Sequence, residues 1–205
     1  PTYPFQGIEI MAMDAEYHYA ARVREVADGF FKTANVFYSA PKHQPYLQPA
    51  LPEWTIVMTS QLLKIDVVTG FVLSKAFFAF LLVLALTGFF TSVTHRRWES
   101  LLAVCVLLFA GTVLGTPWDL PSLLSGSAPS YSFLRFARPI NPQWTVPWFF
   151  LTLWFLSSWL QCRAMWKLLL AAVCTTVLLY SYVYAWTYLG VSLLLLLVWF
   201  AWKRD

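Results

Sequence analysis

Long apolar runs that charged residues rarely interrupt fill the chain from Ser74 onward. A helix of about 20 residues crosses a bilayer, so runs of this length predict membrane-spanning helices. The runs cover residues 75–93, 100–116, 146–160, 167–184 and 188–202, and a short turn at 185–187 separates the last two. The pattern therefore predicts an all-α fold, a polytopic transmembrane helix bundle of about five spans over residues 74–205.

Residues 1–73 contain seven of the ten acidic residues of the chain, and we expect an amino-terminal region of juxtamembrane helices here. One helix is predicted to begin at Asp14, which is a good N-cap, with Glu16 in its first turn. Gly29 suits the position just past the end of this helix. A second, amphipathic helix over residues 53–68 is expected to lie on the membrane surface, with apolar positions at helical spacing (Trp54, Val57, Met58, Leu62 and Ile65).

Prolines separate these two predicted helices. Residues 41–52 cannot form a regular helix, because each proline lacks a backbone N–H and restricts the residue before it. The prolines of the first 73 residues are Pro1, Pro4, Pro41, Pro45, Pro49 and Pro52. We expect an ordered or semi-ordered loop here.

Composition strengthens the membrane interpretation. The chain is 59% hydrophobic and only 12% charged, with a mean hydropathy of +0.60, whereas soluble domains carry roughly 25% charged residues. We therefore expect an integral membrane protein. The net charge of +4 is small and no basic run resembles a nucleic-acid footprint, so no nucleic-acid partner is expected.

The two ends of the chain and its cysteines add little chemistry. Cys105, Cys162 and Cys174 are isolated in or beside apolar runs, and they are expected to be small core residues. No signal peptide is visible, and the chain begins at Pro1 without a methionine, so we expect the start of the natural protein to be missing.

Basic residues predict the orientation. They follow the first, third and fifth runs, at 95–97, 163–167 and 203–204, and basic residues are enriched in cytoplasmic loops. This places residues 1–73 and the loop at 117–145 on the extracytoplasmic side.

That side collects the candidate chemistry. Asp14, His18 and Arg22 follow one another at spacings of four, along one helix face. In an average soluble protein these residues would most simply form a capped surface helix with ordinary charge pairs. Arg135 and Arg138 stand out because positive charge is depleted in outside loops; they could bind a phosphate, or pair with Asp119 or lipid head groups.

The acidic helix and the loops around it resemble the GT-C class of membrane glycosyltransferases. The class includes bacterial aminoarabinose transferases, protein O-mannosyltransferases and oligosaccharyltransferase catalytic subunits, although the WWDYG motif of the last is absent here. The matching residues are Asp14, Glu16, Tyr17, His18, Ala21 and Arg22 with 26–29, then 35–38 through 43–45, and the loop 138–143.

The resemblance implies transfer of a sugar from a polyprenyl-phosphate donor, not a nucleotide sugar, to a lipid, glycan or protein acceptor, on the outer face of a bacterial inner membrane. It implies that Asp14 is the general base, with Glu16 supporting it. It also implies substrate binding by His18, Arg22, Lys42, His43, Arg135 and Arg138, whose cations would stabilise the leaving phosphate.

The sequence departs from the class in three ways. Ala15 separates Asp14 from Glu16, which leaves open which carboxylate is the base and whether the pair holds a divalent metal such as Mg²⁺ or Mn²⁺. Class members also have a span before the acidic loop and more spans after it. We therefore expect a fragment or a reduced relative.

Two other classes of function compete. A part of a transporter is one, although the predicted spans carry almost no ionisable residues, which ion pathways usually need. A non-catalytic scaffold or binder of a lipid-linked glycan is the other.

Overall fold

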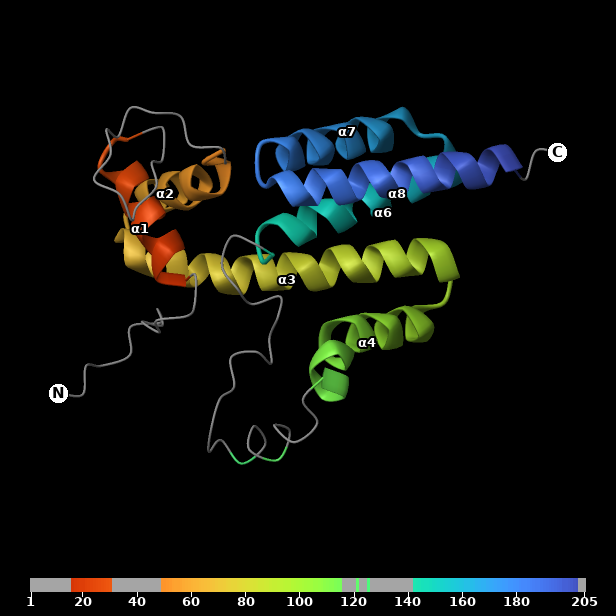
Figure 1. The fold of residues 1–205 in the computed structure, drawn as a ribbon, viewed down its shortest axis with the longest axis horizontal. Helices are drawn as coiled ribbons and strands as arrows, with labels where there is room; N and C mark the ends of the chain where they lie inside the picture. Colours follow the sequence, from red (N-terminus) through yellow and green to blue (C-terminus); the bar gives the residue numbers. More distant parts are fainter. Residues whose placement is uncertain (1–15, 31–48, 116–120, 122–124, 126–141, 203–205) are drawn as a thin grey trace.

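The computed structural model describes residues 16–30, 49–115, 121, 125 and 142–202, and all structural statements below concern these residues. Their regular structure is entirely α-helical, which confirms the predicted all-α class for this part of the chain. The helices are α1 (Glu16–Ala27), α2 (Leu51–Leu63), α3 (Val67–Thr94), α4 (Arg97–Gly115), α6 (Thr145–Cys162), α7 (Met165–Leu179) and α8 (Val183–Trp202), as Figure 1 shows.

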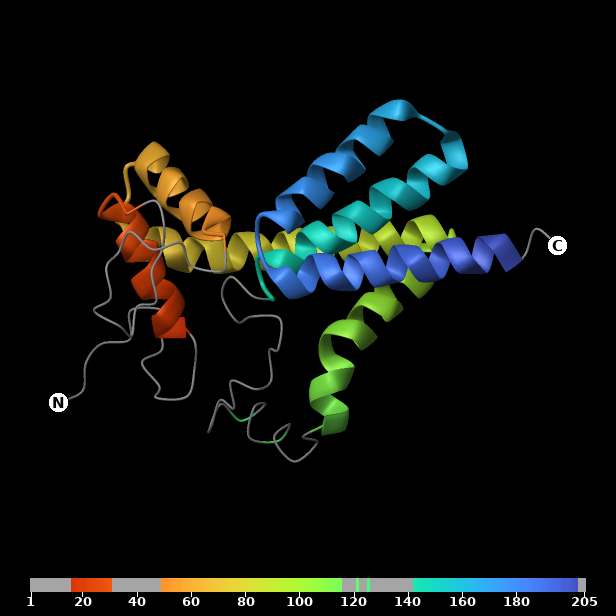
Figure 2. The ribbon, with the colours of Figure 1, turned by 45° about the horizontal axis from the view of Figure 1, so that its top comes forward.

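The bundle is built around α3. This helix packs against α4 and α6, while α7 packs against α6, and α8 contacts both α6 and α7. Successive bundle helices run in opposite directions, as Figures 1 and 2 show. The α3–α4 and α6–α7 turns therefore lie at one end of the bundle, and α1 and α2 lie at the other.

One helix in the described part of the chain, α3, is long and apolar enough to cross a membrane. It has 28 residues. Helix α7 and residues 184–195 of α8 are apolar but shorter. This finding supports one of the five predicted membrane-spanning helices, and the five-span bundle stays a prediction.

Helix α3 begins earlier than the predicted span at residue 75. Asp66 caps it, because its carboxylate accepts a hydrogen bond from the Thr69 backbone N–H at 2.9 Å and another from the Thr69 hydroxyl. Lys75 lies inside the helix, with its ammonium 5.6 Å from the centre of the Phe71 ring. The boundary predicted between the amino-terminal region (1–73) and the helix bundle (74–205) lies within this helix, so no break in secondary structure marks it.

Helix α2 also differs from its predicted bounds of 53–68. It begins at Leu51 with Pro52 in its first turn, where a proline loses no helical hydrogen bond. It ends before Lys64, whose φ of 54° is left-handed. Among the predicted apolar positions Val57 is buried, whereas Met58 and Leu62 are 61% and 82% exposed. The residues that α2 buries are Pro52, Glu53, Ile56, Val57 and Ser60, and the predicted membrane-surface location stays a prediction.

The tight turn predicted at 185–187 is wrong. The chain turns at residues 180–182, and 185–187 lie within α8. Ser181 is buried at this turn, and its hydroxyl donates to the Leu178 carbonyl at 2.7 Å. This local bond satisfies a carbonyl near the end of α7 and lets the helix stop without glycine or proline.

The buried residues form three clusters. The first joins α1, α2 and the start of α3. The other two join α3 to α4 and α6, and α3 to α6 and α7. The bundle core and the small cluster around α1 thus share a single helix, α3.

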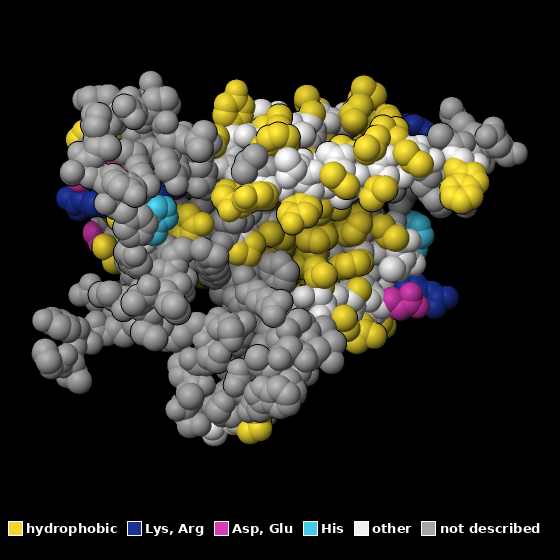
Figure 3. All heavy atoms as spheres, in the orientation of Figure 1, with side chains coloured by type: hydrophobic (Ala, Val, Ile, Leu, Met, Phe, Trp, Pro, Cys, Tyr) yellow, Lys and Arg dark blue, Asp and Glu magenta, His cyan; other side chains and the backbone are white. Residues whose placement is uncertain are grey.

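The outside of the bundle is apolar. In Figure 3 hydrophobic side chains cover the middle of the visible face, and charged side chains lie towards its two ends. The exposed large apolar residues include Phe77, Phe80, Leu102, Val106, Leu169, Val173, Leu194 and Leu197, which come from α3, α4, α7 and α8. Apolar patches of this extent are rare on soluble monomers.

Candidate functional site

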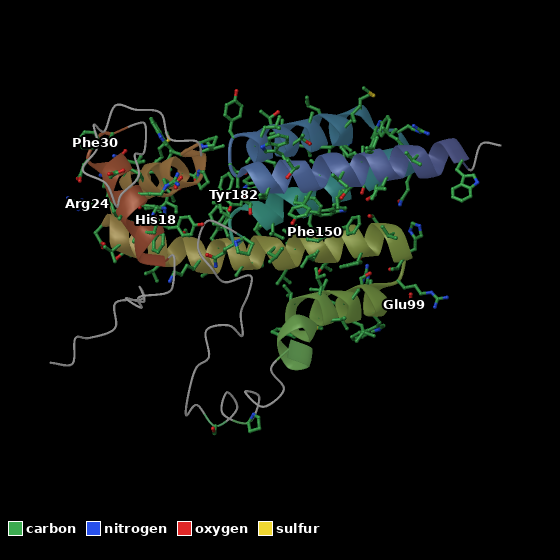
Figure 4. The ribbon with its side chains drawn as sticks, viewed as in Figure 1. His18, Arg24, Phe30, Glu99, Phe150 and Tyr182 are labelled. Atoms are coloured by element: carbon green, nitrogen blue, oxygen red, sulfur yellow. The ribbon has the colours of Figure 1, made fainter. Side chains whose placement is uncertain are left out.

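The helix that carries the acidic motif is docked, not free on the surface. Tyr19, Val23 and Val26 of α1 form a buried cluster with Ile56 and Val57 of α2 and Phe71 of α3. In Figure 4 the labelled His18, Arg24 and Phe30 lie together at this end of the molecule, and Glu99 lies at the opposite end. The motif helix is therefore fixed to the first turns of α3.

A fully buried ion pair joins α1 to α2. The Nε of Arg22 lies 2.7 Å from Oε1 of Glu53, and both side chains are 0% exposed. Burying two charges is costly, and their attraction repays the cost only when the two groups meet in good geometry. The pair therefore constrains which face of α1 meets α2.

Burial controls the charge of Glu53. Loss of hydration raises the pKa of its carboxyl above the ordinary 4.5, although the Arg22 guanidinium opposes this shift. Its Oε2 is buried and makes no hydrogen bond within the described part of the chain. Glu53 is therefore a buried carboxyl at the α1–α2 contact, and loss of hydration destabilises its ionised form.

His18 lies one helical turn before Arg22. It is half-buried, and its ring meets the Tyr19 ring edge-on, with 5.6 Å between centroids. His18 and Arg22 both lie in α1, so the predicted spacing of four applies to them. Arg22, the more buried of the two, meets Glu53 of α2. By contrast, Arg24 and Asp28 form an exposed pair at 3.1 Å, which is the ordinary surface pairing considered above.

Gly29 ends the motif helix as predicted. Its φ is +92°, a conformation that suits glycine, and its N–H donates to the Val26 carbonyl at 3.0 Å. Phe30 N–H then donates to the Glu25 carbonyl at 3.1 Å. These bonds close the carboxyl end of α1.

The start of α6 is tied to the same end of the molecule. The Gln143 side chain donates from Nε2 to the Lys75 carbonyl of α3 at 2.8 Å. The buried Trp144 donates from its indole N–H to the Thr55 hydroxyl of α2 at 3.0 Å and packs on Phe78. Residues 143 and 144, directly before α6, therefore lie beside α2 and α3.

An apolar cavity of about 250 Å³ lies between α2 and α3. Its lining includes Ile56 and Leu63 of α2 and Leu73 and Phe77 of α3, with the Thr55 and Thr59 hydroxyls among them. A cavity with this lining favours an apolar group. Ile56 belongs both to the lining and to the buried cluster around α1.

Several predicted site residues lie outside the described residues. These are Asp14, Lys42, His43, Arg135 and Arg138, and their roles stay predictions. Glu16 is the first residue of α1, and its side chain also lies outside the description. Within the described residues, no three His, Cys, Asp or Glu side chains gather as metal ligands. The predicted alternative of a metal at Asp14 and Glu16 is untested, because both side chains lie outside the description.

Sequence reasoning missed the part that Glu53 plays. It assigned Glu53 to the start of a surface helix, whereas the structure buries it against Arg22. A signal was present: Glu53 is the single charged residue between Leu51 and Leu63, and a carboxylate in such a helix needs a partner once buried. The sequence could not identify that partner, because the pair joins two separate helices.

Comparisons with protein family models, with curated proteins and with solved structures found no match. The functional interpretation therefore rests on the residues of the chain and on the geometry described above.

Proposed function

We propose that the chain is a membrane glycosyltransferase of the GT-C type, which moves a sugar from a polyprenyl-phosphate donor to a lipid, glycan or protein acceptor. The observation that carries the proposal is the docking of α1, the motif helix, onto α2 and the first turns of α3 through the buried Arg22–Glu53 pair. This docking would hold the acidic motif beside the start of the apolar helix α3, where a lipid-linked substrate would present its sugar.

We further propose that α3, α4, α6, α7 and α8 all cross the membrane, with α1 and α2 on the extracytoplasmic side. The alternating helix directions and the apolar outer surface support this arrangement. Helix α7 is the shortest, and its 15 residues extend about 22 Å at 1.5 Å per residue. Local thinning of the bilayer accommodates a helix of this length.

The orientation rests on charge. His95, Arg96 and Arg97 lie at the α3–α4 turn, and Arg163 lies at the α6–α7 turn, at the end away from α1. Basic residues favour the cytoplasmic side. The proposed bacterial inner-membrane location follows from the resemblance and not from this geometry.

In the proposed reaction Asp14 accepts the proton of the acceptor hydroxyl. The hydroxyl oxygen forms a bond to the anomeric carbon of the sugar, and the bond from that carbon to the phosphate oxygen breaks. The polyprenyl phosphate leaves with the electron pair, and Arg135, Arg138 and Lys42 stabilise its charge. Glu16 supports Asp14, and the proton passes from Asp14 to solvent.

Arg22 has a different part in this proposal from the one that the resemblance implies. Its side chain is fully buried against Glu53, so we assign it to holding α1 in place and not to contacting the substrate. His18, which is half-buried one turn away, stays a candidate for substrate contact.

The test replaces Asp14 in the full-length natural protein. In vesicles supplied with polyprenyl-phosphate mannose or polyprenyl-phosphate aminoarabinose, we expect Asp14→Asn to lower transfer to membrane acceptors by about 10²–10⁴-fold, the usual contribution of a general base. Asp28→Asn is the matched control, since Asp28 is an exposed carboxylate just past the carboxyl end of α1, and it should leave transfer unchanged.

The same assay separates the alternatives. If Asp14→Asn and Glu16→Gln each transfer sugar at the natural rate, the catalytic assignment is wrong. If the natural protein retains the labelled donor lipid but transfers none of its sugar, the chain is a binder of lipid-linked glycans and not an enzyme.

A further inference from the structure

A second cavity lies at the end of the bundle opposite the motif helix. Its volume is about 450 Å³, and it runs between α3 and α6. Small-molecule sites occupy roughly 300–1,000 Å³. Leu84, Gly88 and Trp154 form its apolar floor, and Ser92, His95 and Gln161 form its polar rim. We call it the α3–α6 groove.

The floor depends on a close approach of the two helices. A Cβ placed on Gly88 would lie 2.4 Å from the nearest atoms of the Trp154 ring. The indole therefore lies directly on the backbone of α3. This contact makes a flat apolar surface that a side chain at position 88 would obstruct.

Hydrogen bonds between the helices fix the rim. The hydroxyls of Ser92 and Ser157 lie 2.6 Å apart, and the Gln161 amide donates to the Ser92 carbonyl. His95, in the left-handed conformation, ends α3 beside them. The rim is thus a built polar edge at the end of an apolar floor.

The charge around this rim is strongly positive. The α3–α4 and α6–α7 turns and the first turns after them bring Arg96, Arg97, Arg163 and Lys167 to this end. In these described turns Glu99 is the one carboxylate, and it is engaged by Arg96 at 2.7 Å. Arg163 is the C-cap residue of α6, and its guanidinium lies over the Trp159 ring, 5.0 Å from its centre.

We propose that the α3–α6 groove binds an anionic phospholipid. One acyl chain lies along Leu84, Gly88 and Trp154, and the phosphate lies at the rim near Arg163 and His95. Charge complementarity favours an anionic over a zwitterionic head group, because basic residues beside membrane helices attract anionic lipids. The site is separate from the proposed transferase chemistry and does not depend on it.

The direct test measures lipid retention by the full chain. Delipidated protein in dodecyl maltoside is mixed with phosphatidylglycerol or with phosphatidylcholine of the same acyl chains, and bound lipid is counted by native mass spectrometry. We expect at least about five-fold more bound phosphatidylglycerol, in keeping with several cations near the head group.

Paired variants locate the site. Thr87→Trp fills the groove and should reduce phosphatidylglycerol retention several-fold. Thr176→Trp is the matched control: Thr176 lies on α7, and, like Thr87, its hydroxyl donates to the carbonyl four residues earlier. Arg163→Gln should weaken the preference for phosphatidylglycerol several-fold, whereas Arg24→Gln, at the opposite end of the molecule, should leave it intact.

Far-UV circular dichroism on heating shows whether each variant folds, and Leu84→Trp replaces Thr87→Trp if the latter does not. Equal retention of the two lipids by the natural chain would overturn the proposal. So would identical retention by the groove-filling and control variants, or a preference that Arg163→Gln leaves unchanged.

Discussion

The contact between Arg22 and Glu53 is the residue-scale feature on which the position of α1 depends. Each group is fully buried, so each loses its hydration and relies on the other. Tyr19, Val23 and Phe71 belong to the buried apolar cluster that joins α1, α2 and the start of α3. The two residues are therefore expected to act as a unit.

Removal of one partner should be worse than removal of both. Arg22→Met alone leaves the Glu53 carboxyl buried without the guanidinium, and Glu53→Leu alone leaves the Arg22 guanidinium buried without the carboxyl, so each should cost about 3–5 kcal/mol. Arg22→Met combined with Glu53→Leu should be neutral or stabilising by about 1–4 kcal/mol. Hydrogen exchange of the α1 amides in micelles measures the free energy of local opening.

The exposed Arg24–Asp28 pair provides the control for this cycle. Replacement of Arg24 with Gln should change the opening free energy by no more than about 0.5 kcal/mol, because an exposed pair at this spacing is weak. Additive effects of the Arg22 and Glu53 changes would show that the pair does not hold the helix.

Glu53 also predicts a pH dependence. Because burial raises its pKa in the folded state above 4.5, the folded chain keeps a proton that the unfolded chain has lost. The contribution of Glu53 to stability is therefore complete below pH 4.5 and declines as the pH rises through the raised pKa. Unfolding by sodium dodecyl sulfate in mixed micelles, followed at increasing pH, should show this decline.

Two variants assign that slope. Glu53→Gln should remove it. Asp66→Asn should retain it, because the hydrogen bonds from Thr69 lower the pKa of Asp66 below its ordinary 3.8. The contribution of Asp66 to stability is therefore constant at higher pH and is lost only as the pH falls below 3.8. A slope that survives Glu53→Gln would mean that another group titrates.

At the scale of elements, apolar runs predicted that the helices exist, and local polar residues decided where they end. The run beginning at residue 75 identified α3, but the helix starts at Val67 because Asp66 caps it. The α7–α8 turn was misplaced because Ser181 ends α7 by a hydrogen bond to its own helix, a feature that hydropathy does not detect. Helix pairing, which decides the buried face of α2, depends on residues distant in sequence.

The α3–α6 contact gives a prediction for Gly88. Gly88→Ala should destabilise the chain by about 1–3 kcal/mol, because the added methyl group overlaps the Trp154 ring. Gly190→Ala is the control, since Gly190 lies in α8 with open space around it, and it should be stabilising by about 0.5–1 kcal/mol. Unfolding midpoints in mixed micelles compare the two. Equal effects at both positions would mean that the ring moves aside.

At the scale of the whole molecule, the sequence predicted that the basic turns lie on one side, but it predicted the candidate site only in part. The basic turns were expected on one side, and the described turns at 95–97 and 163 lie at one end of the bundle. The motif spacing placed His18 and Arg22 on one face of α1, but no pattern indicated that this face is turned inward onto Glu53. Burial depends on how separate helices meet, and a local pattern does not contain that information.

The proposed topology predicts opposite labelling of two positions on either side of α3. With Cys105, Cys162 and Cys174 replaced by serine, the Gln61→Cys variant should react with a membrane-impermeant maleimide in right-side-out vesicles. The Glu99→Cys variant should react only in inverted vesicles. Both positions are exposed. Labelling of both variants from the same side would show that α3 does not cross the membrane.

If the chain is the proposed transferase, the length of α3 has a consequence for its acceptors. Its 28 residues extend about 42 Å, whereas the hydrocarbon core of a bilayer is about 30 Å thick. In a bilayer about two turns project beyond the core, and Phe71 in those turns carries the α1–α2 cluster. In the proposed transferase this length would set the height of α1 above the lipid tails. Under that proposal we expect acceptors whose hydroxyl reaches this height to be used in preference to those whose hydroxyl lies lower or higher.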